Sequence, residues 1–101
     1  MSVSMNVDAD AREVRIYDGG LLEWTSNNRE LNLYNGGGIY VNSGGTLDEN
    51  GRNNAQVWFV TDGSDYVIQN EGTITIDNIQ ARNSGGNITV TGAGDITANI
   101  L

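Results

Sequence analysis

The chain has 101 residues, which is the size of one domain, and its 13 acidic and five basic residues give a net charge of −8. This charge repels phosphates and anionic headgroups, so we expect neither nucleic acids nor membrane surfaces as partners. The chain contains no cysteine, which excludes disulfides and Cys-based metal sites.

The composition is typical of an all-β protein. The chain has 14 glycines, 14 asparagines and no proline. Many of these glycines and asparagines lie between short Val, Ile and Leu runs, where residues that tolerate positive φ form the turns between strands.

Within residues 1–11, the stretch Ser2–Val7 alternates polar and apolar side chains, with Val3, Met5 and Val7 on one side. We expect an N-terminal arm or a capping strand in this segment. It has no basic region followed by a long apolar run, so Sec-type export is not expected.

The two segments that follow, 12–28 and 29–45, are similar over 17 residues without a gap. Looser copies continue to the end of the chain, and each copy has two short strands with two apolar positions apiece. A repeat that places apolar residues in the same columns predicts a β-solenoid, in which each coil pairs in parallel with the next. We therefore expect one solenoid domain over residues 12–101, with about five coils and a period near 17 residues. In this register Leu31 lies between Val14 and Trp58.

An antiparallel β-meander or small sandwich is the alternative fold. Asn35-Gly36 and Asp62-Gly63 are strong hairpin signals as well as solenoid turns. The run Asn35–Gly38 also has the glycine content of a phosphate-binding loop, but such a loop needs a following helix and usually a lysine. We interpret this run as a turn stacked on Asp18–Gly20, and we expect no cofactor.

Residues 46–55 interrupt the repeat and predict a loop excursion. Asp48, Asn50 and Asn53 surround Gly51 in a pattern that resembles an oxygen-rich calcium loop, although the terminal bidentate Glu is missing. A weak calcium site and a plain polar loop both remain open.

Carboxylate pairs are the remaining route to catalysis, because many glycosidases use two acids. Glu13 and Glu30 fall in register on adjacent coils, and Arg12 and Arg29 fall beside them. A ladder of surface ion pairs explains this pattern better than a catalytic site, so we do not expect an enzyme.

The C-terminal stretch ends at Ile100 and Leu101 with its apolar alternation intact. A solenoid end must be capped or paired. We therefore expect Val3, Met5, Val7, Ile100 and Leu101 to bind protein partners, either in a homo-oligomer, with a trimer favoured, or in a larger assembly such as a capsid.

The segment Tyr34–Gly45, together with the NSGGTL of Asn42–Leu47, resembles the repeats in the passenger domains of self-associating autotransporter adhesins. It is also similar to the coils of phage fibre and spike β-helices. The resemblance implies an exterior structural role and transfers no catalytic residue. The leading hypothesis is a phage virion component, such as a capsid decoration (cement) protein or a short fibre part. The alternative is an extracellular fragment of a bacterial surface adhesin that binds glycans or itself.

Overall fold

The structure is a computed structural model that describes residues 2–34, 36–60, 65–82 and 87–100. It confirms the all-β solenoid. The described residues contain no helix, and their parallel strands stack into about four turns with a period of about 22 residues. The coil number and the period thus differ from the expected five and 17. The antiparallel alternative is wrong, because every strand pair described is parallel.

The described chain contains twelve strands. In chain order they are β1 (Ser2–Met5), β2 (Ala9–Ala11), β3 (Val14–Ile16), β4 (Leu21–Trp24), β5 (Glu30–Tyr34), β6 (Gly38–Val41), β7 (Thr46–Asp48), β8 (Gln56–Val60), β9 (Tyr66–Asn70), β10 (Thr73–Arg82), β11 (Ile88–Thr91) and β12 (Asp95–Ile100).

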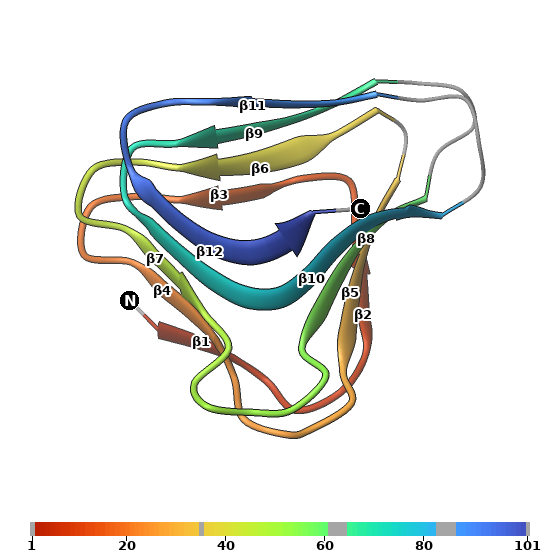
Figure 1. Ribbon diagram of the computed structural model, residues 1–101. Coiled ribbons are helices and arrows are strands. Elements are labelled where there is room, and N and C mark those ends of the chain that lie inside the picture. Colours follow the sequence, from red (N-terminus) through yellow and green to blue (C-terminus); the bar gives the residue numbers. More distant parts are fainter. Residues whose placement is uncertain (1, 35, 61–64, 83–86, 101) are drawn as a thin grey trace.

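Seen along its axis, the solenoid is a triangle, and each coil adds one strand to each of three faces (Figure 1). The first face holds β1, β4, β7 and the starts of β10 and β12, the second holds β2, β5, β8 and the ends of β10 and β12, and the third holds β3, β6, β9 and β11. β10 bends across the corner between the first two faces, because Thr73–Thr75 pair with β7 and Asn78–Arg82 pair with β8. This bend joins both faces into one eight-stranded sheet, while the third face is a separate four-stranded sheet.

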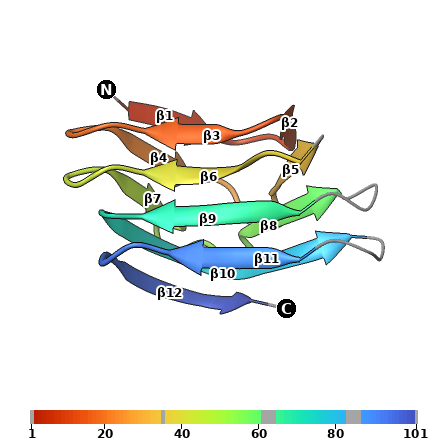
Figure 2. The ribbon, with the colours of Figure 1, turned by 90° about the horizontal axis from the view of Figure 1, so that it is seen from above.

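The stacking direction is the short dimension of the molecule. Five strands are stacked on the first face, and four spacings of about 4.8 Å give roughly 19 Å. The overall extents are 33 × 28 × 20 Å, so the two longer values describe the triangular cross-section. Figure 2 shows the coils side by side from the N-terminal to the C-terminal end.

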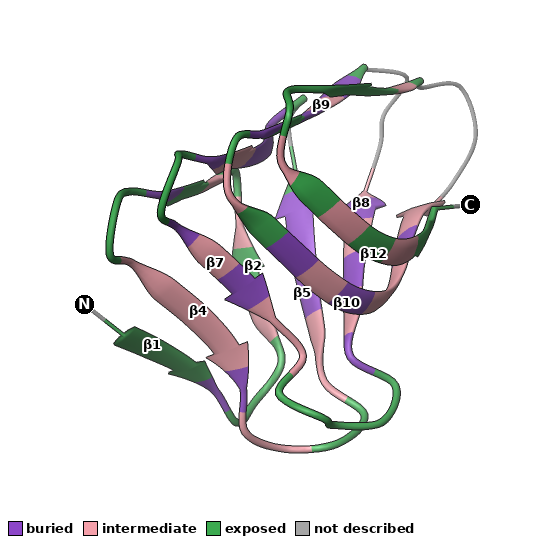
Figure 3. Cartoon of the chain, turned by 60° about the vertical axis from the view of Figure 1, so that its left-hand side comes forward, coloured by how far each residue is buried: buried purple, intermediate pink, exposed green. Residues whose placement is uncertain are grey.

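The core lies inside the triangle, where side chains from successive coils stack in columns. Leu33 pairs with Phe59, which pairs with Ala81 on the next coil, and both Leu33 and Phe59 are fully buried. The Phe59 ring stacks on Tyr66 at 4.5 Å between centroids, and the Tyr66 hydroxyl donates to the Val60 carbonyl at 2.7 Å. Buried residues are concentrated in the middle coils, and exposure rises toward β1 and β12 (Figure 3).

The expected 17-residue register is wrong. Val14 pairs with Ile39 rather than Leu31, and Leu31 pairs with Val57 rather than Trp58, which faces outward. Each of the two similar 17-residue segments contains two strands, whereas a coil contains three. The similarity therefore relates strand–turn units that lie on different faces.

The turns follow the corrected register. The backbone N–H of Gly19 donates to the Gly44 carbonyl at 3.0 Å, so Asp18–Gly20 stacks on the turn that contains Gly44. The expected neighbour, Gly37, lies against Arg12 instead.

Glycine occupies the corner between the third and first faces in four coils, at Gly20, Gly45, Gly72 and Gly94. A Cβ on Gly72 would lie 2.3 Å from the Gly45 carbonyl oxygen, and a Cβ on Gly94 would lie 2.3 Å from that of Gly72. Because side chains do not fit between such closely stacked backbones, the glycine pattern in the sequence marks this corner.

Two expected boundaries also change. The described part of residues 1–11 forms β1 and β2, which pair with β4 and β5 and complete the first coil. The expected loop at residues 46–55 begins with strand β7, and the rest of that segment turns the corner between the first and second faces.

Candidate functional site

The N-terminal end of the solenoid exposes the inside of the first coil. Among the described strands, β1, β2 and β3 each pair with one neighbour, so one edge of each strand has unpaired backbone groups. A cavity of about 460 Å³ opens at this end, and its lining includes Val3, Val14, Ile16 and Leu22. This end is therefore hollow and partly apolar.

The C-terminal end also exposes side chains that continue the core columns. β11 and β12 each pair with one described neighbour. Val90 follows Ile39 and Ile68 in one column but is 45% exposed, and Ile100 follows Ile79 but is 40% exposed. These two side chains present apolar surface where a further coil would continue the stack.

The candidate partner-binding residues divide into two groups. Val3, Val7 and Ile100 are exposed, with Val3 at 52% and Val7 at 59%. Met5 is only 5% exposed, because it pairs in register with Trp24 and belongs to the core. Leu101 lies outside the described residues. Partner binding through the exposed residues stays a prediction.

The loop after β7 contains the candidate calcium ligands Asp48, Asn50 and Asn53. Asp48 Oδ1 accepts the Asn50 N–H at 2.9 Å, Asn50 Nδ2 donates to the Trp24 carbonyl at 3.2 Å, and the Asn53 N–H donates to Asn27 Oδ1 at 2.9 Å. These bonds shape the loop and tie it to the coil before it. The part of the chain that the structure describes has no group of three acidic, His or Cys side chains that could hold a metal ion. The calcium site stays a prediction.

Glu13 and Glu30 do not form the stacked pair that the sequence suggests. Glu13 precedes β3 on the third face and pairs with Arg15 at 3.1 Å, whereas Glu30 begins β5 on the second face and pairs with Arg82 at 3.0 Å. The expected 17-residue register placed these two strands on one face, whereas β3 and β5 lie on different faces. Each carboxylate instead has its own surface ion pair.

A different pair of carboxyl groups, Glu49 and Asp77, meets at the corner between the first and second faces. The Glu49 N–H donates to the Thr75 carbonyl at 2.7 Å, and Asp77 Oδ2 accepts the Ala55 N–H at 3.0 Å. Both carboxyl groups line a small cavity of about 250 Å³. The pair therefore links two consecutive coils at the bend of β10.

The Glu49 carboxyl has the most perturbed acidity among the described groups. The hydrogen bond to Asp77, burial, and the negative charges of Asp77 and Asp48 raise the pKa of Glu49 to about 7. Glu49 Oε2 is buried without a hydrogen-bond partner, and protonation of the carboxyl supplies the hydrogen that a bond between two carboxylates requires. The sequence pattern does not indicate this pair, because only the three-strand coil brings residues 49 and 77 to one corner.

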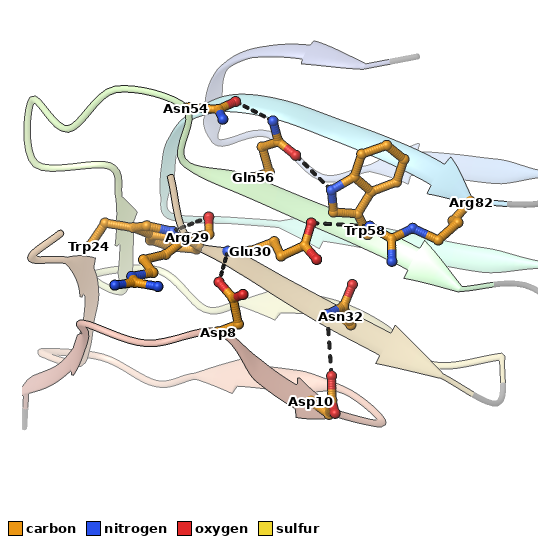
Figure 4. A network of polar contacts seen from close by, with 10 residues as sticks. All are labelled: Asp8, Asp10, Trp24, Arg29, Glu30, Asn32, Asn54, Gln56, Trp58 and Arg82. Carbon is orange, nitrogen blue, oxygen red and sulfur yellow. Dashed lines mark hydrogen bonds and ion pairs between the residues drawn. The ribbon is translucent and has the colours of Figure 1, made fainter. Parts of the chain in front are cut away.

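The outer side of the second face carries a polar network around Trp58 (Figure 4). Trp58 Nε1 donates to Gln56 Oε1 at 2.6 Å, and the Arg82 guanidinium lies 4.4 Å from the centre of the Trp58 ring. Arg82 also holds Glu30, while Asn32, opposite Trp58 in register, is only 7% exposed. The network combines an aromatic ring with amide and charged groups on the outer side of the second face.

Comparison with protein-family models, curated proteins and solved structures finds no match for this chain. Within the described ranges, no helix has the length and apolar character needed to cross a membrane. The candidate functional features of the described chain are therefore the two solenoid ends, the carboxyl pair and the outer network.

Proposed function

We propose that this protein is a non-enzymatic structural and interaction protein that forms part of a larger protein assembly. The proposal depends on one observation: both ends of the solenoid expose core-facing apolar side chains beside strand edges that are unpaired in the described chain. Exposed apolar surface and open strand edges are typical of sites where another protein binds.

The charge of the chain supports the same class of partner. With a net charge of −8, the molecule is repelled by nucleic acids and anionic membranes at long range. Apolar ends on a polar, acidic body favour docking onto a protein surface.

The leading setting for this role is a bacteriophage virion, where the protein serves as a capsid decoration protein or a short fibre part. The resemblance of Tyr34–Leu47 to phage fibre and spike coils supports this setting. The triangular body also supports this setting, because it separates two distinct end surfaces.

Mass spectrometry of purified particles and of cell-surface fractions tests the setting. We expect the protein in the particles at a fixed ratio to the major coat protein. Particles assembled with Val3→Asp should lose it, whereas Val67→Asp, the same change on the outer side of the middle strand β9, should keep it. Absence of the wild-type protein from purified particles contradicts the proposal.

A surface adhesin that binds glycans is the second candidate, and the Trp58 network is the observation that favours it. Aromatic rings flanked by amides and charges suit ligands that are both apolar and polar. A glycan array probed with the wild type, with Trp58→Ala and with Val67→Asp tests this role. Binding that is lost only in Trp58→Ala would support it, and no glycan binding by the wild type would exclude it.

A further inference from the structure

The two ends of the solenoid are complementary, and we propose that copies of this chain stack head to tail, with the C-terminal end of one copy on the N-terminal end of the next. This inference rests on the proposed function, because it names the protein that covers the ends as a second copy. The interface joins β1, β2 and β3 of one copy to β11 and β12 of its neighbour.

Strand direction fits this arrangement. Every described pair within the chain is parallel, and shifting a copy along the axis keeps its strands parallel to those of its neighbour. The alternation of inward-facing and outward-facing side chains is also kept, since Val3 on β1 and Val90 on β11 both lie in core-facing columns. Head-to-tail contact therefore continues both the hydrogen-bond ladder and the core.

The shapes of the two ends distinguish head-to-tail contact from contact between two like ends. The N-terminal end has the cavity of about 460 Å³, whereas the C-terminal end presents the exposed side chains of Val90 and Ile100. Two N-terminal ends placed face to face would enclose two unfilled cavities, which is unfavourable in an apolar contact. When the hollow N-terminal end instead meets the C-terminal end, the exposed apolar side chains of the C-terminal end occupy the cavity.

The helical rise of the solenoid also sets the rotation between copies. β12 begins on the first face, one layer beyond the last full coil, and ends on the second face, where Asn99 and Ile100 pair with Asn78 and Ile79 of β10. A second copy that is turned by one third of a revolution places β2 below β11 and β3 below β12, and its β1 meets the end of β12 on the second face. In this register the small Ala9 and Ala11 of β2 face the larger Ile88 and Val90 of β11.

The size of the contact is sufficient for reversible association. A triangle within the 33 × 28 Å cross-section has a projected area of about 460 Å², so the two ends together cover roughly 900 Å². The accessible area of a corrugated surface is larger than its projection, which brings the contact near the value of about 1,200 Å² at the lower limit of stable interfaces. We therefore expect association at micromolar to millimolar protein concentrations.

Sedimentation velocity of the wild type and of end variants tests the stacking. We expect the average mass of the wild type to rise with concentration to more than twice the 10.8 kDa of the monomer. Val3→Asp damages the N-terminal end, Val90→Asp damages the C-terminal end, and each variant alone should stay monomeric. An equimolar mixture of the two should form dimers and nothing larger, because each variant keeps one intact end.

Val67→Asp is the matched control, because it adds the same charge on an outer surface of a middle coil. It should associate like the wild type. Circular dichroism should show an unchanged fold for all variants, since Val3 and Val90 are 52% and 45% exposed.

Three results would overturn the stacking: a monomeric wild type at all concentrations, dimers of Val90→Asp alone, or a mixture that stays monomeric. A monomeric wild type found in purified particles would refute the stacking and leave the proposed function intact. If the protein stacks in solution but is absent from purified particles, the stacking is supported and the proposed function is contradicted.

Discussion

Replacing Glu49 by glutamine should change how the stability of this protein depends on pH. The contacts with Asp77 and Asp48 and partial burial raise the pKa of Glu49 from 4.5 to about 7. Between these two values the unfolded chain releases the Glu49 proton and the folded chain keeps it. The free energy of unfolding therefore falls as pH rises through this window, and the loss is complete above about pH 7.

The size of the effect follows from the shift. For a fully buried group, a rise in pKa from 4.5 to about 7 changes the free energy of unfolding by roughly 3.4 kcal/mol. Because Glu49 is only partly buried, solvent screening should reduce the effect to about 1–1.5 kcal/mol. In Glu49→Gln, the amide donates a hydrogen bond to Asp77 at every pH. The variant should therefore match the wild type near pH 4.5 and be about 1 kcal/mol more stable near pH 8.

Urea unfolding followed by tryptophan fluorescence measures this difference, since Trp24 is fully buried and Trp58 is half-buried. Glu23→Gln, on the neighbouring strand β4, controls for the loss of one negative charge from an acidic chain. A stability difference between Glu49→Gln and the wild type that does not change from about pH 4.5 to about pH 8 would refute the shared proton.

Three further predictions concern packing and association. Gly72→Ala should destabilise the fold by about 1–3 kcal/mol, because its Cβ would lie 2.3 Å from the Gly45 carbonyl oxygen, and a lower melting temperature would report this. Phe59→Ala should destabilise by about 3–5 kcal/mol in urea unfolding, whereas the outward-facing Trp58→Ala should have a clearly smaller effect. Stacking of copies should strengthen as salt rises, because salt screens the repulsion between chains of net charge −8, and sedimentation at two salt concentrations checks this.

The fold class could be predicted from the sequence because its causes are local. Alternating apolar residues define strands that are buried on one side, and glycines such as Gly45 and Gly72 mark a corner where backbones stack closely. The exposed apolar ends could also be predicted, since Val3 and Ile100 continue the alternation to the first and last strands.

The register could not be predicted, because corner length varies from coil to coil. A loop joins β7 to β8, whereas β10 turns the same corner without interruption. No fixed period describes such a chain, and a strand–turn unit has the same local pattern on each face. The Glu49–Asp77 pair depends on this register, and Met5 is buried because the register places it opposite Trp24.

The equivalence of strand–turn units also makes the rotation between stacked copies testable. The two similar 17-residue segments place related strands on different faces, so a strand of one face can meet the edge of another face without a mismatch of pattern.

The chain has no cysteine, so introduced cysteines report contacts between copies directly. If copies turn by one third of a revolution, Asp10→Cys on β2 lies beside Thr89→Cys on β11, within the span of about 4.4–6.8 Å between Cα atoms that a disulfide needs. Without the turn, Ser4→Cys on β1 lies beside Thr97→Cys on β12. We expect oxidation to cross-link the first mixture and not the second, and the opposite result would contradict the rotation while leaving head-to-tail contact in place.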